Sequence, residues 1–191
     1  MKKTLFLICI LFCIASINAV PSYEMLFSGS ANVPTVKLTN TSTLEQITEF
    51  TLTIGNTGYN FDALYQVVHN VGGYTLLSPD SNSGGGARSN VDHVTFTGFD
   101  PNEYFQFGTD IDIDNSNTGE DYRTVMFNNG SNPNAVLTVK FSNGETLTQT
   151  LPDAPASNTT FLLTQVSPVP EPTTVFLLSL SLLGIAFLRK K

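Results

Sequence analysis

The sequence contains no tryptophan, only two cysteines and two histidines, and charged residues make up just 13% of its 191 residues. So few histidines and cysteines leave little material for the metal centres and catalytic groups that depend on them. Only four basic residues lie between the two ends of the chain, against fifteen acidic ones. We therefore do not expect the protein to bind nucleic acid, because such binding needs a basic surface that displaces counterions.

The length and the residue composition of the chain are typical of one exported domain of ordinary size. Hydrophobic residues make up 41% of the chain, which is enough to form a packed core. Threonine, asparagine, serine and glycine take the place of the missing charged residues, a composition typical of β-rich exported proteins.

The N-terminus has the three parts of a secretory signal peptide. Lys2 and Lys3 precede an apolar run over residues 5–14, and a short stretch of small residues ends at Ala19. This pattern predicts a signal peptide over residues 1–19 that signal peptidase removes. Both cysteines lie within it, so the exported domain is expected to fold without a disulfide.

The C-terminus also has three parts in a fixed order. They are the motif Pro170-Glu171-Pro172, an apolar run over residues 173–188, and the basic tail Arg189-Lys190-Lys191. As a helix the apolar run rises about 24 Å, so flanking basic side chains must help it to cross a hydrocarbon core of about 30 Å. We therefore predict one transmembrane helix, with the basic tail in the cytoplasm and the acidic domain outside.

The segment Val169–Lys191 closely resembles the PEP-CTERM sorting domain of exported bacterial proteins. The resemblance implies inner-membrane anchoring, recognition by exosortase (a membrane cysteine transpeptidase-like enzyme) and processing near Pro-Glu-Pro. It further implies delivery to the cell surface or to the exopolysaccharide matrix of Gram-negative, biofilm-forming bacteria. It concerns sorting by residues 168–191 and leaves open what the domain over residues 20–167 does.

Residues 20–167 are dominated by alternating apolar and polar positions, the two-residue period of half-buried strands. The clearest runs are residues 50–54, 94–97, 105–107, 137–141 and 160–166. Eight or nine short strands predict an all-β fold, an antiparallel β-sandwich or a jelly-roll-like domain.

One hairpin is predicted in detail, and two segments stay ambiguous. Residues 135–151 read as two strands around Asn143-Gly144, a pair that favours a type I′ turn. Ser42–Glu45 has the spacing of a helical capping box within a threonine-rich strand pattern. Residues 61–69 fit a short helix or a strand, and residues 78–90 are expected to form an exposed glycine-rich loop.

The strongest cluster of functional residue types is acidic. Asp110, Asp112 and Asp114 alternate with two isoleucines, which would place the three carboxylates on one face of a strand, and Glu120 and Asp121 follow a short loop. Alternating carboxylates before a polar loop are one way to collect oxygen ligands for calcium. The alternative is a solvated acidic strand that discourages edge-to-edge aggregation.

No motif in the domain assigns an activity. The favoured function is non-enzymatic, a structural or adhesive role at the cell surface, with calcium as the one cofactor considered. The first alternative is a carbohydrate-binding module that uses aromatic side chains on exopolysaccharide. Its candidates are Tyr59, Phe61, Tyr65, Tyr74, Phe99 and Tyr104. The second alternative, a secreted hydrolase built on His69 or His93, lacks the Gly-x-Ser-x-Gly motif.

Overall fold

The computed structural model describes residues 19–56, 58–62, 64–78, 89–114, 116, 118–154 and 160–168. Residues Val20–Ser167 form one compact unit. The predicted signal peptide up to residue 18, the Pro-Glu-Pro motif and the predicted transmembrane helix lie outside the described residues, as does most of the predicted glycine-rich loop. In the part of the chain that is described, no helix is long and apolar enough to cross a membrane.

The described residues contain twelve strands and one short π-helical turn, so the number of strands expected from the sequence was too low. The strands are β1 (Ser22–Gly29), β2 (Pro34–Asn40), β3 (Ile47–Thr53), β4 (Tyr59–Phe61), β5 (Tyr65–His69), β6 (Gly73–Ser78), β7 (Val91–Thr97), β8 (Tyr104–Gly108), β9 (Ile111–Ile113), β10 (Val136–Phe141), β11 (Thr146–Thr150) and β12 (Thr160–Val166). The π-helical turn spans Arg123–Phe127.

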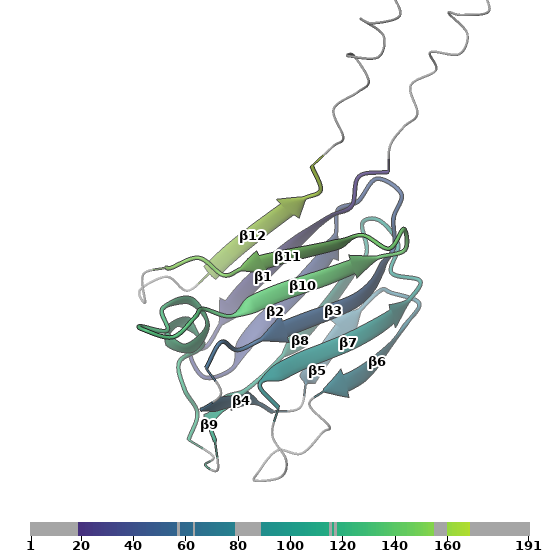
Figure 1. Ribbon diagram of the computed structural model, residues 1–191. Coiled ribbons are helices and arrows are strands. Elements are labelled where there is room, and N and C mark those ends of the chain that lie inside the picture. The colour runs from purple at the N-terminus through teal and green to yellow at the C-terminus, as the bar shows by residue number, and fades with distance from the viewer. Residues whose placement is uncertain are drawn as a thin grey trace, which may run out of the picture. The chain divides into compact units, whose positions relative to one another are not determined.

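The strands form two five-stranded sheets that lie face to face, together with a small two-stranded ribbon (Figure 1). The first sheet has the order β12-β1-β2-β8-β5 and the second has the order β11-β10-β3-β7-β6. The ribbon pairs β4 with β9 at one end of the sandwich (Figure 1). Every strand pair is antiparallel, which confirms the all-β antiparallel prediction. The finer jelly-roll-like topology stays a prediction.

The alternation in the sequence decides which side chains enter the space between the sheets. In β8, for example, Phe105 and Phe107 are buried while Gln106 is only half-buried. Phe107 contacts Phe50 of the opposite sheet edge-on, with 5.9 Å between the ring centroids, and Phe105 contacts Phe96 at 5.1 Å. Each buried phenylalanine contributes about 1.5–3 kcal/mol through burial, and each such ring pair adds about 0.5–1.5 kcal/mol.

The predicted hairpin is confirmed, but the type of its turn is different. Strands β10 and β11 pair up to Lys140 and Thr146, and the Phe141 N–H donates to the Glu145 carbonyl at 2.9 Å. Three residues therefore form the loop, and only Gly144 has a positive φ, +86°. A type I′ turn would need two residues with positive φ, whereas one glycine after a type I turn forms the usual three-residue hairpin with a bulge.

Both ambiguous segments adopt extended or irregular backbone. Ser42–Glu45 forms no helix, because the buried Asn40 side chain takes over the local hydrogen bonding. Its amide donates to the carbonyls of Glu45 and Phe99, both at 2.9 Å, and its oxygen accepts the Ser42 N–H at 3.0 Å. Between residues 61 and 69, the described residues belong to β4 and β5 and to the stretch that joins them.

The first and last strands of the sandwich are direct neighbours. Strand β12 pairs with β1 along seven residues, from Ser22 opposite Val166 to Ser28 opposite Thr160. Beyond this ladder the Ser167 N–H donates to the Pro21 carbonyl at 2.8 Å. The two ends of the compact unit therefore lie side by side.

Candidate functional site

The β4–β9 ribbon brings together two acidic segments that are about fifty positions apart in the sequence. Asn60 lies opposite Asp112, and Phe61 lies opposite Ile111. The ladder continues one step further, because the Asp62 N–H donates to the Asp110 carbonyl at 2.9 Å. The ribbon thus places Asp62 beside the alternating aspartates.

Asp62, Asp110 and Asp112 form a compact group of carboxylates. One oxygen from each lies within 4.8 Å of the others, Asp62 and Asp112 are buried, and Asp110 is half-buried. Two negative charges at this separation repel by roughly 3 kcal/mol at an effective dielectric constant of 20, before any compensation. Carboxylate oxygens in such a group are ligands for a hard divalent cation such as calcium.

The simple alternation predicted for residues 110–114 holds only in part. Asp112 is just 3% exposed, whereas Ile113 is 37% exposed. The expected solvated acidic face is therefore wrong at Asp112. The reason is that β9 forms its own ribbon with β4 and is not part of either large sheet, so its two faces are not simply core and solvent.

The structure does not bring the other predicted metal ligands into this group. Asp114 is exposed and accepts a hydrogen bond from the Asn60 side-chain amide at 2.8 Å. The loop does fold back, since the Glu120 N–H donates to the Ile111 carbonyl at 2.7 Å, but its carboxylate is not one of the three that gather. Whether calcium binds any of these residues stays a prediction.

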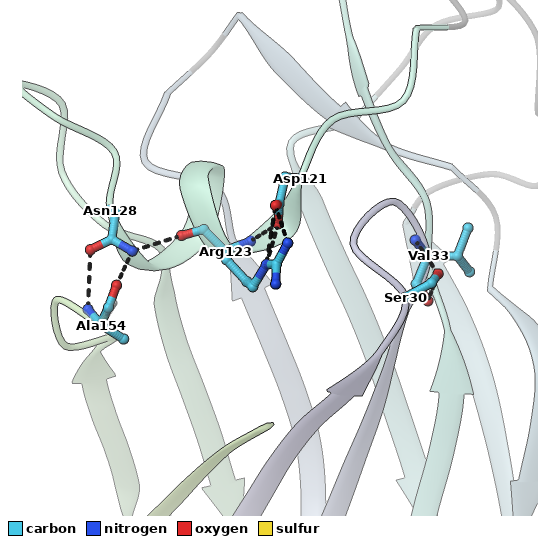
Figure 2. A network of polar contacts seen from close by, with 6 residues as sticks. All are labelled: Ser30, Val33, Asp121, Arg123, Asn128 and Ala154. Atoms are coloured by element: carbon cyan, nitrogen blue, oxygen red, sulfur yellow. Dashed lines mark hydrogen bonds and ion pairs between the residues drawn. The ribbon is translucent and has the colours of Figure 1, made fainter. Parts of the chain in front are cut away.

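Asp121, the last predicted ligand, faces a cation that the protein supplies itself (Figure 2). The Arg123 Nε lies 2.8 and 3.1 Å from the two carboxylate oxygens of Asp121. This charged hydrogen bond lowers the pKa of Asp121. Asp121 also accepts the Arg123 backbone N–H at 3.0 Å, where the π-helical turn Arg123–Phe127 begins. At the other end of the turn, the Asn128 side chain hydrogen-bonds to the carbonyl of Arg123 and to both backbone groups of Ala154 (Figure 2). These hydrogen bonds hold the turn in place, and the Asp121 carboxylate is bound to the Arg123 guanidinium.

A fourth aspartate that the sequence did not single out lies inside the sandwich. Asp92 belongs to β7 and shares its inward face with Val94 and Phe96. Its side chain is 0% exposed, and among the residues that the structure describes neither carboxylate oxygen has a hydrogen-bond partner. Burial raises the pKa of Asp92 well above its usual range. The Thr109 side chain beside it opposes that rise without reaching hydrogen-bonding geometry.

Tyr65 connects Asp92 with the group of three. Burial raises the pKa of the Tyr65 hydroxyl, and the charges of four aspartates raise it further. They are Asp110, Asp62, Asp112 and Asp92. All four carboxylates therefore act electrostatically on the same Tyr65 hydroxyl.

The two histidines occupy separate environments. The His93 Nε2 lies 3.0 Å from a carboxylate oxygen of Glu49, which also pairs with the Lys140 ammonium at 2.8 Å. The hydrogen bond from Lys140 is the main cause that lowers the pKa of Glu49. His69 packs against the rings of Tyr74 and Phe105. Within the described residues, neither imidazole hydrogen-bonds to a serine or threonine hydroxyl.

The aromatic residues considered for sugar stacking do not share one surface. Phe61 and Phe99 are buried in the core, and only Tyr74 is clearly exposed. Tyr104 is half-buried, and its ring carries the Lys37 ammonium 4.5 Å from the centroid.

The fold and this site together define an acidic, antiparallel β-sandwich domain with a cluster of carboxylates at one end. Residues 168–191 match the family model described as the PEP-CTERM protein-sorting motif. The chain therefore carries a PEP-CTERM sorting motif, and this supports export through an exosortase system. Comparisons with curated proteins and with solved structures found no match, so the role of Val20–Ser167 depends on its own structure.

Proposed function

We propose that the protein is an exosortase-sorted surface or matrix component with a non-enzymatic, structural or adhesive role. In this proposal signal peptidase removes residues 1–19, and residues 168–191 hold the domain at the inner membrane until exosortase acts. The sandwich Val20–Ser167 is then the part that reaches the cell surface or the extracellular matrix.

The observation that carries the proposal is the PEP-CTERM motif at residues 168–191, directly after the last strand of the sandwich. The domain also has the composition of an exported protein, because it has few charged residues and both cysteines of the sequence, Cys9 and Cys13, precede it. Its core consists of aromatic and aliphatic side chains from both sheets, so packing and strand pairing can stabilise it outside the cell without a disulfide.

Carbohydrate binding is the second candidate, and one feature favours it. Tyr74 is exposed, and Tyr104 presents a half-buried ring beside Lys37, so aromatic groups for sugar stacking do reach the surface. A glycan array probed with the full chain in detergent would distinguish the two roles. Binding to an exopolysaccharide that Tyr74→Ala or Tyr104→Ala abolishes would favour the carbohydrate-binding module.

The sorting part of the proposal is tested by mass spectrometry in a host that has exosortase. The mature protein should lack Leu188–Lys191, whereas the Pro170→Ala, Pro172→Ala double variant should keep these residues and stay in the inner membrane. Pro168→Ala is the matched control, because it changes a proline outside Pro170-Glu171-Pro172 and should be processed normally. Recovery of wild-type surface protein with an intact C-terminus would overturn the proposal.

A further inference from the structure

The group Asp62, Asp110 and Asp112 has dimensions that suit one calcium ion. Calcium binds oxygen ligands at about 2.3–2.6 Å, so two oxygens on the same ion lie at most about 5 Å apart. The three carboxylates already satisfy this limit, with one oxygen of each within 4.8 Å of the others. Two of them are buried: Asp112 lies on β9, which pairs with β4, and Asp62 follows β4 with its N–H bonded to the Asp110 carbonyl, so the backbone sets both positions.

Asp92 is the second, independent observation. It comes from a different sheet, is completely buried, and offers two carboxylate oxygens that have no hydrogen-bond partner in the described part of the chain. Its side chain meets that of Thr109, the residue next to Asp110, and it shares the surroundings of the Tyr65 hydroxyl with the other three. A buried polar group without a partner is costly, so an arrangement that keeps one needs a reason.

We propose that Asp62, Asp110 and Asp112 bind a calcium ion at the ribbon end of the sandwich, with Asp92 facing it from the interior. The ion predicted from the sequence is thus assigned to a different set of ligands. Two of them, Asp110 and Asp112, come from the predicted set, Asp62 is new, and Asp114, Glu120 and Asp121 are left out.

Such a site would join three parts of the fold that are distant in the sequence. Asp62 follows β4, Asp110 and Asp112 belong to the β9 segment, and Asp92 lies on β7. An ion that binds only the folded state stabilises it by mass action, which matters in a domain without disulfides. The calcium proposal is independent of sorting and surface delivery, so a negative result for calcium would leave the sorting proposal unaffected.

Terbium(III), a luminescent substitute for calcium, tests the position of the site. Terbium emits when an excited aromatic ring transfers energy to it, and this transfer falls steeply with distance. The chain has no tryptophan, so Tyr65 is the expected donor. We expect sensitised luminescence from the full chain in detergent, displaced by calcium more effectively than by magnesium. Tyr65→Phe should remove most of the signal, whereas Tyr104→Phe, which changes a tyrosine at the other end of β8, should not.

Variants of the carboxylates test the ligands. Asp62→Asn and Asp112→Asn should each weaken terbium binding by at least about tenfold, as loss of groups that hold a metal usually does. Asp153→Asn is the matched control, because it removes the same charge from an exposed position, where the carboxylate accepts a hydrogen bond from Asn134. Circular dichroism checks that each variant is folded. The Tyr65→Phe measurement keeps every carboxylate, so it is decisive even if a ligand variant unfolds.

Three outcomes would overturn the proposal. The first is no sensitised luminescence at millimolar terbium, and the second is luminescence that persists in Tyr65→Phe and in both ligand variants. The third is stronger competition by magnesium than by calcium, which would remove the assignment to calcium.

Discussion

Replacing the buried carboxylate Asp92 with its uncharged amide should stabilise the domain. Asp92→Asn keeps the size of the side chain and removes a charge that is 0% exposed and has no hydrogen-bond partner. Burial raises the pKa of Asp92, so the folded state is destabilised either by the desolvation of the charged carboxylate or by the protonation that neutralises it. Asparagine avoids both costs, and its amide can donate a hydrogen bond to Thr109.

The size and the sign of the effect follow from linkage. Since the pKa of Asp92 is raised in the folded state, the native protein holds this proton more tightly than the unfolded chain. The contribution of Asp92 to stability is therefore most favourable below about pH 4 and is lost as the pH rises towards its folded-state pKa. Each pH unit in that window is worth about 1.4 kcal/mol, so the gain for Asp92→Asn at pH 7 is at most about 4 kcal/mol. A lower bound of about 1 kcal/mol comes from the cost of an unsatisfied buried group.

Urea denaturation followed by circular dichroism, with excess chelator from pH 4 to pH 8, is the assay. The variant should be more stable than the wild type at pH 7, and the difference should shrink as the pH approaches 4. Asp62, Asp110 and Asp112 are present in both proteins, so the difference between the two isolates Asp92. Asp153→Asn should change stability by less than about 0.5 kcal/mol. A variant that is less stable at pH 7, or a difference that does not depend on pH, would refute this reasoning.

Two further predictions concern a backbone contact and an ion pair. A Cβ on Gly55 would lie 2.1 Å from the Pro133 carbonyl oxygen, so Gly55→Ala should destabilise the domain by more than about 3 kcal/mol in thermal melts. Gly58→Ala, whose Cβ would meet only the end of a flexible side chain, is the control and should be almost neutral. Lys140→Met should cost less than about 1 kcal/mol at pH 7 in urea titrations, because its partner Glu49 is near the surface. This cost should vanish as the pH falls through the lowered pKa of Glu49, and a constant cost would contradict the pairing.

The parts of the fold that the sequence predicted well are those with local causes. The hairpin of β10 and β11 was predictable because two alternating segments flank a turn-forming Asn143-Gly144 pair. The type of its turn was not predictable, because it depends on which residue pair forms the last hydrogen bond of the hairpin. Asn143 can adopt either sign of φ, so the sequence alone does not decide this. The strand β12 was predictable from its own alternation, whereas its pairing with β1 joins opposite ends of the domain.

The candidate site shows the same division between local and distant causes. Asp110 and Asp112 stood out because they are close together in the sequence. Asp62 did not, because only the pairing of β4 with β9 brings it to them. Asp92 could have been found, since its alternation with Val94 and Phe96 places it on the buried face of a predicted strand. Asp121 pairs with Arg123, two residues away in the sequence, and its role as a ligand stays a prediction.

The chain between the end of β12 and the Pro-Glu-Pro motif is short, and this limits how an enzyme can reach the motif. Only three residues separate Val166, the last residue of this strand, from Pro170 of the sorting motif. A fully extended chain covers at most about 14 Å over that distance. An enzyme that cuts at the motif after the domain has folded must therefore approach within that reach of the β1–β12 edge. The alternative order, cleavage before β12 docks, would leave Phe161 and Leu163 outside the core at that moment. Folding and release are thus coupled by the shortness of one linker.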